Sequence, residues 1–171
     1  MPTLHLLRHA KSSWGGAGLA DHDRPLTERG QRAAAVVGAY LRRTGIAPDR
    51  VLCSTARRAI ETLEAIRGGL PEAVPVETTR DIYEVGADRI LARLRATDPS
   101  VDVLLLIGHN PGIEGLAAWL AGANSDRDAM RRLSGKFPTG ALASLSFVGP
   151  WSELSDEGAA LIRFVTPKGL V

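Results

Sequence analysis

Short apolar runs alternate along the chain with stretches in which apolar residues recur every three or four positions. A continuous apolar run is typical of a buried strand, and the three- or four-residue period is typical of a helix with one buried face. The runs predict strands over residues 3–7, 50–54, 74–76, 101–107, 141–148 and 161–165. The periodic stretches predict a helix from Thr27 to Gly45, one capped by Ser54 or Thr55, and helices over residues 88–96 and 114–121.

The order of these elements predicts the fold class. Strands that alternate with helices and end in a hairpin indicate one α/β domain over residues 1–171, a three-layer α/β/α sandwich with a mixed, mainly parallel sheet. The run 101–107 is the most apolar, as expected of a central strand covered on both faces. Residues 8–24 form a long polar loop, which in a compact domain usually serves a site. The polar stretch 124–136 predicts no clear element.

Composition and charge exclude several classes of protein. The net charge of +2 suits an anionic ligand and is too small to indicate nucleic acid binding. No apolar stretch reaches about 18 residues and the amino terminus is not basic-then-apolar, so we expect no membrane insertion, no export and a cytoplasmic location. The single cysteine, Cys53, lies in an apolar run, and we expect it to be buried in the core rather than reactive.

Cationic and imidazole side chains follow three of the predicted strands. Arg8 and His9 follow the first strand, Arg58 lies in the first turn of the helix after the second, and His109 follows the run 101–107. The carboxyl ends of parallel strands meet at one sheet edge, where α/β proteins bind ligands. Guanidinium groups match phosphate oxygens bidentately. A lone histidine is more often structural, but three such strand ends together predict a pocket for a phosphoryl group.

These stretches also resemble a known family. Residues 8–12, Arg-His-Ala-Lys-Ser, resemble the signature of the histidine phosphatase (phosphoglycerate mutase-like) superfamily. Residues 54–62, Ser-x-x-x-Arg-Ala-x-x-Thr, resemble its second motif, and residues 108–112, Gly-His-Asn-Pro-Gly, resemble its third. Together with residues 23–27 and 137–140, they are most similar to the SixA branch of phosphohistidine phosphatases.

The resemblance implies roles for the site residues. His9 would be the nucleophile that receives the phosphoryl group as a phosphohistidine, which water then hydrolyses. Arg8, Arg58 and His109 would hold the phosphoryl oxygens, and neither a metal nor a cofactor is implied. Glu84 lies roughly where many members carry a proton-donating carboxylate, although SixA-like members can lack it. Glu84 is therefore either the proton donor or a surface carboxylate.

The long loop carries weaker candidates. Ser12 either donates to a phosphate oxygen or caps a turn. Arg24 either contacts a phosphate or the protein that bears it, or is an exposed loop charge. We expect Trp14 to pack the loop. Residues 21–23, Asp-His-Asp, are potential metal ligands, but adjacent residues rarely converge on one ion, so we expect no metal site there.

The resulting hypothesis is a phosphatase that hydrolyses phosphohistidine in proteins through a phosphorylated His9. One alternative is a phosphatase of small phosphate esters or sugar phosphates, which a proton donor at Glu84 would favour. Another is a phosphate-recognition module without turnover, which would not need a nucleophile. The partner is accordingly a phosphorylated protein or a small phosphorylated metabolite, with no nucleic acid or membrane partner. We expect a monomer.

Overall fold

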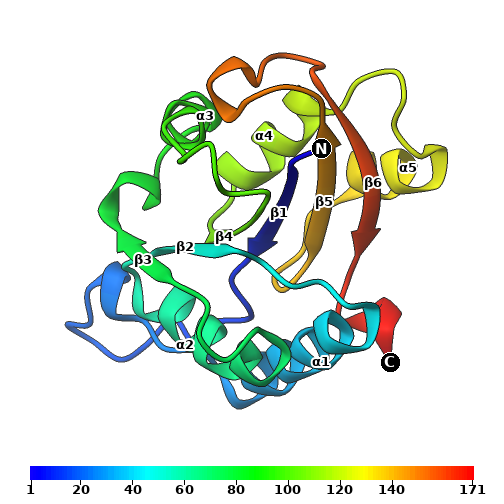
Figure 1. The fold of residues 1–171 in the computed structure, drawn as a ribbon. Coiled ribbons are helices and arrows are strands. Elements are labelled where there is room, and N and C mark those ends of the chain that lie inside the picture. The colour runs from blue at the N-terminus through cyan, green and yellow to red at the C-terminus, as the bar shows by residue number, and fades with distance from the viewer.

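Six strands form one sheet in the computed structural model, which describes residues 1–171. The strands are β1 (Thr3–Arg8), β2 (Arg50–Ser54), β3 (Val76–Thr79), β4 (Val103–Gly108), β5 (Leu142–Phe147) and β6 (Ala159–Val165). They lie in the order β3-β2-β4-β1-β5-β6 (Figure 1). The first four are parallel to one another, whereas β5 is antiparallel to both β1 and β6. The sheet is therefore mixed and mainly parallel, as predicted.

Helices cover both faces of this sheet. They are α1 (Glu28–Thr44), α2 (Arg57–Ile66), α3 (Ala87–Arg95), α4 (Gly112–Leu120) and α5 (Arg127–Gly135). Helices α1 and α2 pack on one face over a core of 18 buried residues, and α3, α4 and α5 pack on the other over a core of 27 (Figure 1). Two separate cores on opposite faces of one sheet confirm the three-layer α/β/α architecture.

Local sequence signals predicted some helix boundaries correctly and others wrongly. Thr27 accepts a hydrogen bond from Gly30 N at the start of α1, and Gly45 ends the helix in the left-handed region at φ 71°, both as predicted. The predicted cap of α2 was wrong: the N-cap is Ala56, and the Ser54 hydroxyl accepts from Ala56 N instead. The same hydroxyl has a second contact, with His109.

Two other expectations need correction. Strand β3 begins at Val76 rather than ending there, because Val74 N donates to the Pro71 carbonyl in a turn and Pro75 has no N–H to give to the ladder. The stretch 124–136 contains α5, whose N-cap Asp126 accepts from Ala129 N. Only two residues of this helix are buried, so its apolar stripe is too sparse to predict it.

The pairing of β1 with β4 positions the site. These two parallel strands are neighbours, and Arg8 lies directly opposite Gly108. The ladder continues one residue further, since His9 N donates to the Gly108 carbonyl at 3.0 Å. Five of the six residues of β4 are buried, as predicted for a central strand. His9 and His109 therefore leave the sheet side by side at the carboxyl ends of adjacent strands.

Cys53 is fully buried in the core between the sheet and helices α1 and α2, as expected. Burial raises the pKa of its thiol to about 12, so the reactive thiolate form is suppressed. No helix is both long and apolar enough to cross a lipid bilayer.

Candidate active site

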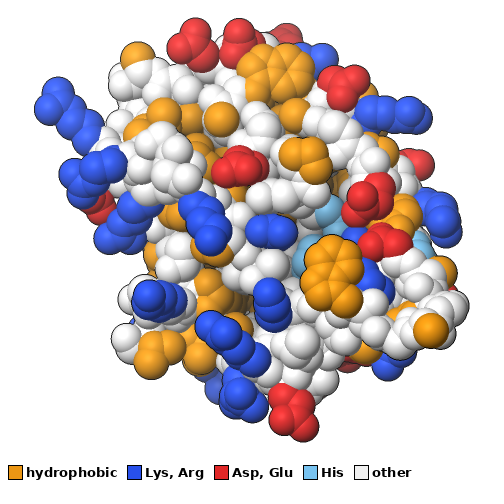
Figure 2. Space-filling model, turned by 180° about the vertical axis from the view of Figure 1, so that it is seen from behind, with side chains coloured by type: hydrophobic (Ala, Val, Ile, Leu, Met, Phe, Trp, Pro, Cys, Tyr) orange, Lys and Arg blue, Asp and Glu red, His pale blue; other side chains and the backbone are white.

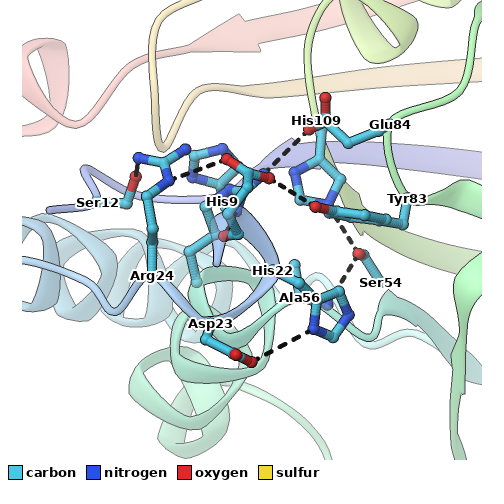
Figure 3. A network of polar contacts seen from close by, with 12 residues as sticks. His9, Ser12, His22, Asp23, Arg24, Ser54, Ala56, Tyr83, Glu84 and His109 are labelled. Atoms are coloured by element: carbon cyan, nitrogen blue, oxygen red, sulfur yellow. Dashed lines mark hydrogen bonds and ion pairs between the residues drawn. The ribbon is translucent and has the colours of Figure 1, made fainter. Parts of the chain in front are cut away.

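The two strand-end histidines face each other. The ring centroids of His9 and His109 are 5.2 Å apart, and the two residues are only 6% and 4% exposed. In Figure 3, His9 lies between Ser12 and Arg24 on one side and His109, Tyr83 and Glu84 on the other. The structure thus brings together the imidazoles that the sequence placed at separate strand ends.

His9 is held as a neutral imidazole with a defined tautomer. Its Nδ1 lies 2.7 Å from the Ala10 carbonyl, which can only accept, so Nδ1 carries the proton and the lone pair lies on Nε2. Burial lowers the pKa of His9 to about 4, and the positive charges of Arg58, Arg8 and Arg24 act in the same direction against the opposing effect of the carbonyl. An unprotonated Nε2 at neutral pH is what a nucleophile requires.

Ser54 orients the ring of His109 through a hydrogen bond. Its Nε2 lies 2.7 Å from the Ser54 hydroxyl, whereas its Nδ1 is buried without a partner. Burial is the largest cause that lowers the pKa of His109 to about 3, and the positive charges of protonated His9 and of Arg58 act in the same direction. Ser54 already accepts from Ala56 N, so its own proton is available to His109 Nε2. That arrangement leaves the proton on Nδ1, a donor with no acceptor in the protein.

Two arginines add further donors. Arg8 donates from Nη1 to the Phe137 carbonyl at 3.0 Å, and Arg58, which is 2% exposed, donates from Nη1 to the Asp21 carbonyl at 2.8 Å. The Nε atoms of both arginines are buried and lack any partner. Buried donors are rarely left unpaired, and unpaired ones call for a ligand. The unpaired donors of Arg8, Arg58 and His109 suit an anionic group that accepts several hydrogen bonds.

Thr62 joins the first two sequence motifs. Its hydroxyl donates to the Arg58 carbonyl at 2.7 Å and accepts from Ala10 N at 3.0 Å. One buried side chain therefore fixes the backbone next to His9 relative to the first turn of α2. The threonine four residues after Arg58 has a structural role in the site.

Asp21 is a site residue that sequence reasoning missed. Its carboxylate accepts from Tyr83 at 2.6 Å, from Arg24 at 3.0 Å and from Arg58 at 3.2 Å. These bonds, the one from Tyr83 above all, lower the pKa of Asp21 to about 2. Tyr83 also packs edge-on against the ring of His109, at 5.4 Å between centroids. Asp21 and Tyr83 belong to no local motif, and only their contacts across the fold place them here.

Glu84 reaches the site as an acceptor. Its carboxylate bonds Arg58 Nη2 at 3.0 Å while its side chain stays 52% exposed. Its backbone adopts a left-handed conformation at φ 53°, which is uncommon for a residue other than glycine. Such conformations concentrate at functional sites. The structure therefore brings Glu84 to Arg58, and its role as proton donor stays a prediction.

Ser12 and Arg24 lie at the entrance of the pocket. Arg24 donates to the Ser12 hydroxyl at 3.1 Å, and its side chain is 12% exposed, so it is not a free loop charge. The expectation that Trp14 packs the loop was wrong: Trp14 is 83% exposed, with the Arg24 guanidinium 4.5 Å from its ring centroid. The loop is held by Arg24 rather than by its tryptophan.

The side chains of residues 21–23 do not meet at one point, although His22 Nδ1 lies 3.7 Å from the Asp23 carboxylate. The carboxylate of Asp21 turns to Arg58, and His22 Nε2 bonds the Thr55 hydroxyl at 2.8 Å. The structure holds no group of three or more His, Cys, Asp or Glu side chains placed to bind a metal ion.

Comparisons with known proteins agree with this geometry. The family described as Histidine phosphatase superfamily (branch 1) matches residues 4–95, more than half of the chain. An uncharacterized protein of Mycobacterium leprae is 39% identical over 165 residues, which are 95% of this chain and 100% of that protein. The solved structure of SixA from Nakamurella multipartitia has a TM-score of 0.84 at 35% identity and covers 97% of this chain and 96% of its own.

A second solved SixA structure, from Agrobacterium tumefaciens, has a TM-score of 0.79 at 29% identity and covers 98% of this chain and 99% of its own. The family match covers the segments that carry Arg8, His9 and Arg58, and the two solved structures cover nearly the whole chain. The chain therefore belongs to the histidine phosphatase superfamily, in its SixA-like branch.

Proposed function

We propose that this protein is a phosphatase that hydrolyses phosphohistidine in proteins through a phosphorylated His9. The observation that carries the proposal is the state of His9: its Nδ1 proton is held by the Ala10 carbonyl, and Nε2 is free and neutral beside unpaired donors. A recognition module needs the donors alone, whereas a nucleophile accounts for the imidazole. The SixA proteins to which the chain is similar are named for phosphohistidine phosphatase activity.

The reaction has two steps. His9 Nε2 attacks phosphorus and the P–N bond to the substrate imidazole breaks. That imidazole leaves as the neutral base, with the proton that its other ring nitrogen carries in the protonated phosphohistidine. Arg8, Arg58 and His109 donate to the phosphoryl oxygens and stabilise the charge that these carry in the transition state. Water then attacks the phosphorus, the P–Nε2 bond breaks and inorganic phosphate is released. Dividing one displacement into two lowers the barrier of each.

A second candidate is hydrolysis of a small phosphate ester. The carboxylate of Glu84 favours it, because an alkoxide leaving group benefits strongly from a proton donor and Glu84 lies 3.0 Å from Arg58. A substrate imidazole takes up a proton readily and depends less on such a donor. The two candidates therefore differ in what they require of Glu84.

Trapping of the intermediate tests the proposal. The protein is mixed with 32P-labelled phosphohistidine protein or a labelled small ester and quenched in alkaline detergent, because phosphohistidine is acid-labile. We expect alkali-stable label on the wild type and on His22→Ala, a control at a nearby half-buried histidine, and none on His9→Ala. The protein donor should label faster than the ester. Faster labelling by the ester selects the second candidate, and binding of both donors without label on the protein refutes a His9 intermediate.

A further inference from the structure

A groove rich in cations runs beside the catalytic pocket. Two hollows of about 910 and 530 Å³ share Lys136, Pro138, Thr166 and Lys168 in their walls and so form one depression. Six cations line these hollows, and one of them, Arg132, is paired with Asp128. We call the depression the basic groove and define it by the other five, Lys11, Arg29, Arg32, Lys136 and Lys168. The chain has only three lysines, and all three line this groove. Figure 2 shows blue side chains gathered beside the pale blue histidines on one face of the molecule.

The five cations have no partner in the protein. None of them forms an ion pair, and none of their side chains donates a hydrogen bond. Many of the other arginines are paired in this way, as Arg57 is with Glu61 and Arg93 with Glu77. No acidic side chain lines either hollow. These five side chains therefore present to solvent a positive charge that no acidic side chain of the groove compensates.

The groove lies next to residues of the catalytic pocket. Lys11 lies two residues after His9 and forms part of the groove wall. Pro138, which lines both hollows, follows Phe137, whose carbonyl accepts from Arg8. A substrate whose phosphoryl group sits on His9 therefore extends over the groove if it is large enough.

We infer that the basic groove docks the acidic surface of the protein that carries the phosphoryl group. This inference rests on the proposed function, because it requires a protein substrate at His9. Complementary charge across an interface speeds encounter and selects among partners. The groove would then favour phosphoproteins with several carboxylates next to the phosphorylated side chain.

The form of the groove favours a protein over a small anion. The catalytic pocket offers buried donors without partners, which suit one compact anion, whereas the five cations of the groove are all exposed. They also come from separate parts of the chain: the segment after β1, helix α1, the end of α5 and the last turn. One exposed charge contributes little to binding. An occupant gains from this groove only by contacting several of its cations at once, as a protein surface does.

Neutralising two groove lysines tests the inference. The variant is Lys136→Gln/Lys168→Gln, and the matched control is Arg89→Gln/Arg127→Gln, which removes two exposed arginines that also lack ion pairs on α3 and α5. The donors are an acidic histidine-phosphotransfer domain carrying phosphohistidine, histidine-phosphorylated histone H4, which is basic, and phosphoimidazole. We expect the groove variant to raise KM for the acidic donor roughly three- to tenfold with kcat unchanged. The control variant, the basic donor and phosphoimidazole should show no such rise.

An equal KM for the acidic donor in the groove and control variants overturns the inference. A rise in KM for phosphoimidazole as large as that for the acidic donor also overturns it, because that result would assign the groove to small phosphates. A binding measurement distinguishes failure of the docking inference from failure of the proposed function. The unphosphorylated acidic domain is titrated against His9→Ala with and without the two groove substitutions, and fluorescence anisotropy gives Kd. Weaker binding in the groove variant supports docking even if the wild type releases no phosphate from the phosphorylated domain. That lack of turnover would refute the proposed function alone.

Discussion

Lowering the pH is expected to leave the nucleophile active until well below neutrality. Burial, reinforced by Arg58, Arg8 and Arg24, lowers the pKa of His9 to about 4 from an ordinary value of 6.5. At pH 5, a group with a pKa of about 4 is about nine tenths neutral, whereas one with a pKa of 6.5 is about one thirtieth neutral. Attack by His9 at pH 5 should therefore be about 30-fold faster than an unperturbed histidine would allow.

The assay is an NMR titration of the free protein with 15N-labelled histidine rings, in which the signals lost in His9→Ala identify His9. We expect a midpoint near 4 and, above it, a protonated Nδ1 and an unprotonated Nε2. The pH profile of kcat/KM, corrected for ionisation of the substrate phosphate, should fall on its acid side with the same midpoint.

A midpoint near 6.5 would refute the claim that burial and three guanidinium groups keep His9 neutral. A proton on Nε2 above the midpoint would refute the role of the Ala10 carbonyl. Either result would remove the physical basis for calling His9 a ready nucleophile at neutral pH.

Three further predictions follow from the same contacts. Burial lowers the pKa of His5 and His9 to about 4 and that of His109 to about 3, so unfolding takes up protons below pH 6.5. The free energy of unfolding should therefore fall by on the order of several kcal/mol as the pH drops from 6.5 to 3. Urea titrations that show equal stability at pH 7 and pH 4 would contradict this. Ser54→Ala removes the partner of His109 Nε2 and the acceptor of Ala56 N, so we expect a loss of about 1–3 kcal/mol in stability, a mixture of His109 tautomers in the 15N spectrum and a lower kcat. Ser54→Thr is the control, because it keeps the hydroxyl. A single unchanged tautomer in Ser54→Ala would count against Ser54 as a positioning residue. Glu84→Gln should slow hydrolysis of a small ester by about 100-fold more than hydrolysis of phosphohistidine if Glu84 donates a proton; equal losses on both substrates would mean that Glu84 acts only through its ion pair with Arg58.

The sequence predicted the parts of the site that depend on strand ends. Arg8, His9 and His109 follow apolar runs directly, and parallel strands bring such ends to one edge whatever the detailed packing. Arg58 follows from the same rule, because it lies in the first turn after β2. The three-layer architecture likewise depends on periodicity and was predicted correctly, although helix α5 was not predicted.

What the sequence could not predict depends on side chains that meet across the fold. Asp21 contacts Arg58 and Tyr83 from the long loop, and no spacing along the chain encodes those contacts. The cap of α2 was misplaced because Ser54 has two roles, one of which is its contact with His109. The basic groove escaped notice for the same reason, since its cations come from separate parts of the chain.

The one-residue extension of β1 and β4 has a consequence for folding. His9 and His109 are 100 residues apart along the chain, and only the pairing of these two central strands aligns them. A partly folded chain with its helices or its β5–β6 hairpin in place would still hold the two imidazoles apart. Catalytic competence should therefore appear only when the central strands have paired, which makes the reaction a reporter of complete folding. Segments at the entrance can vary in sequence and motion without changing the spacing of this pair.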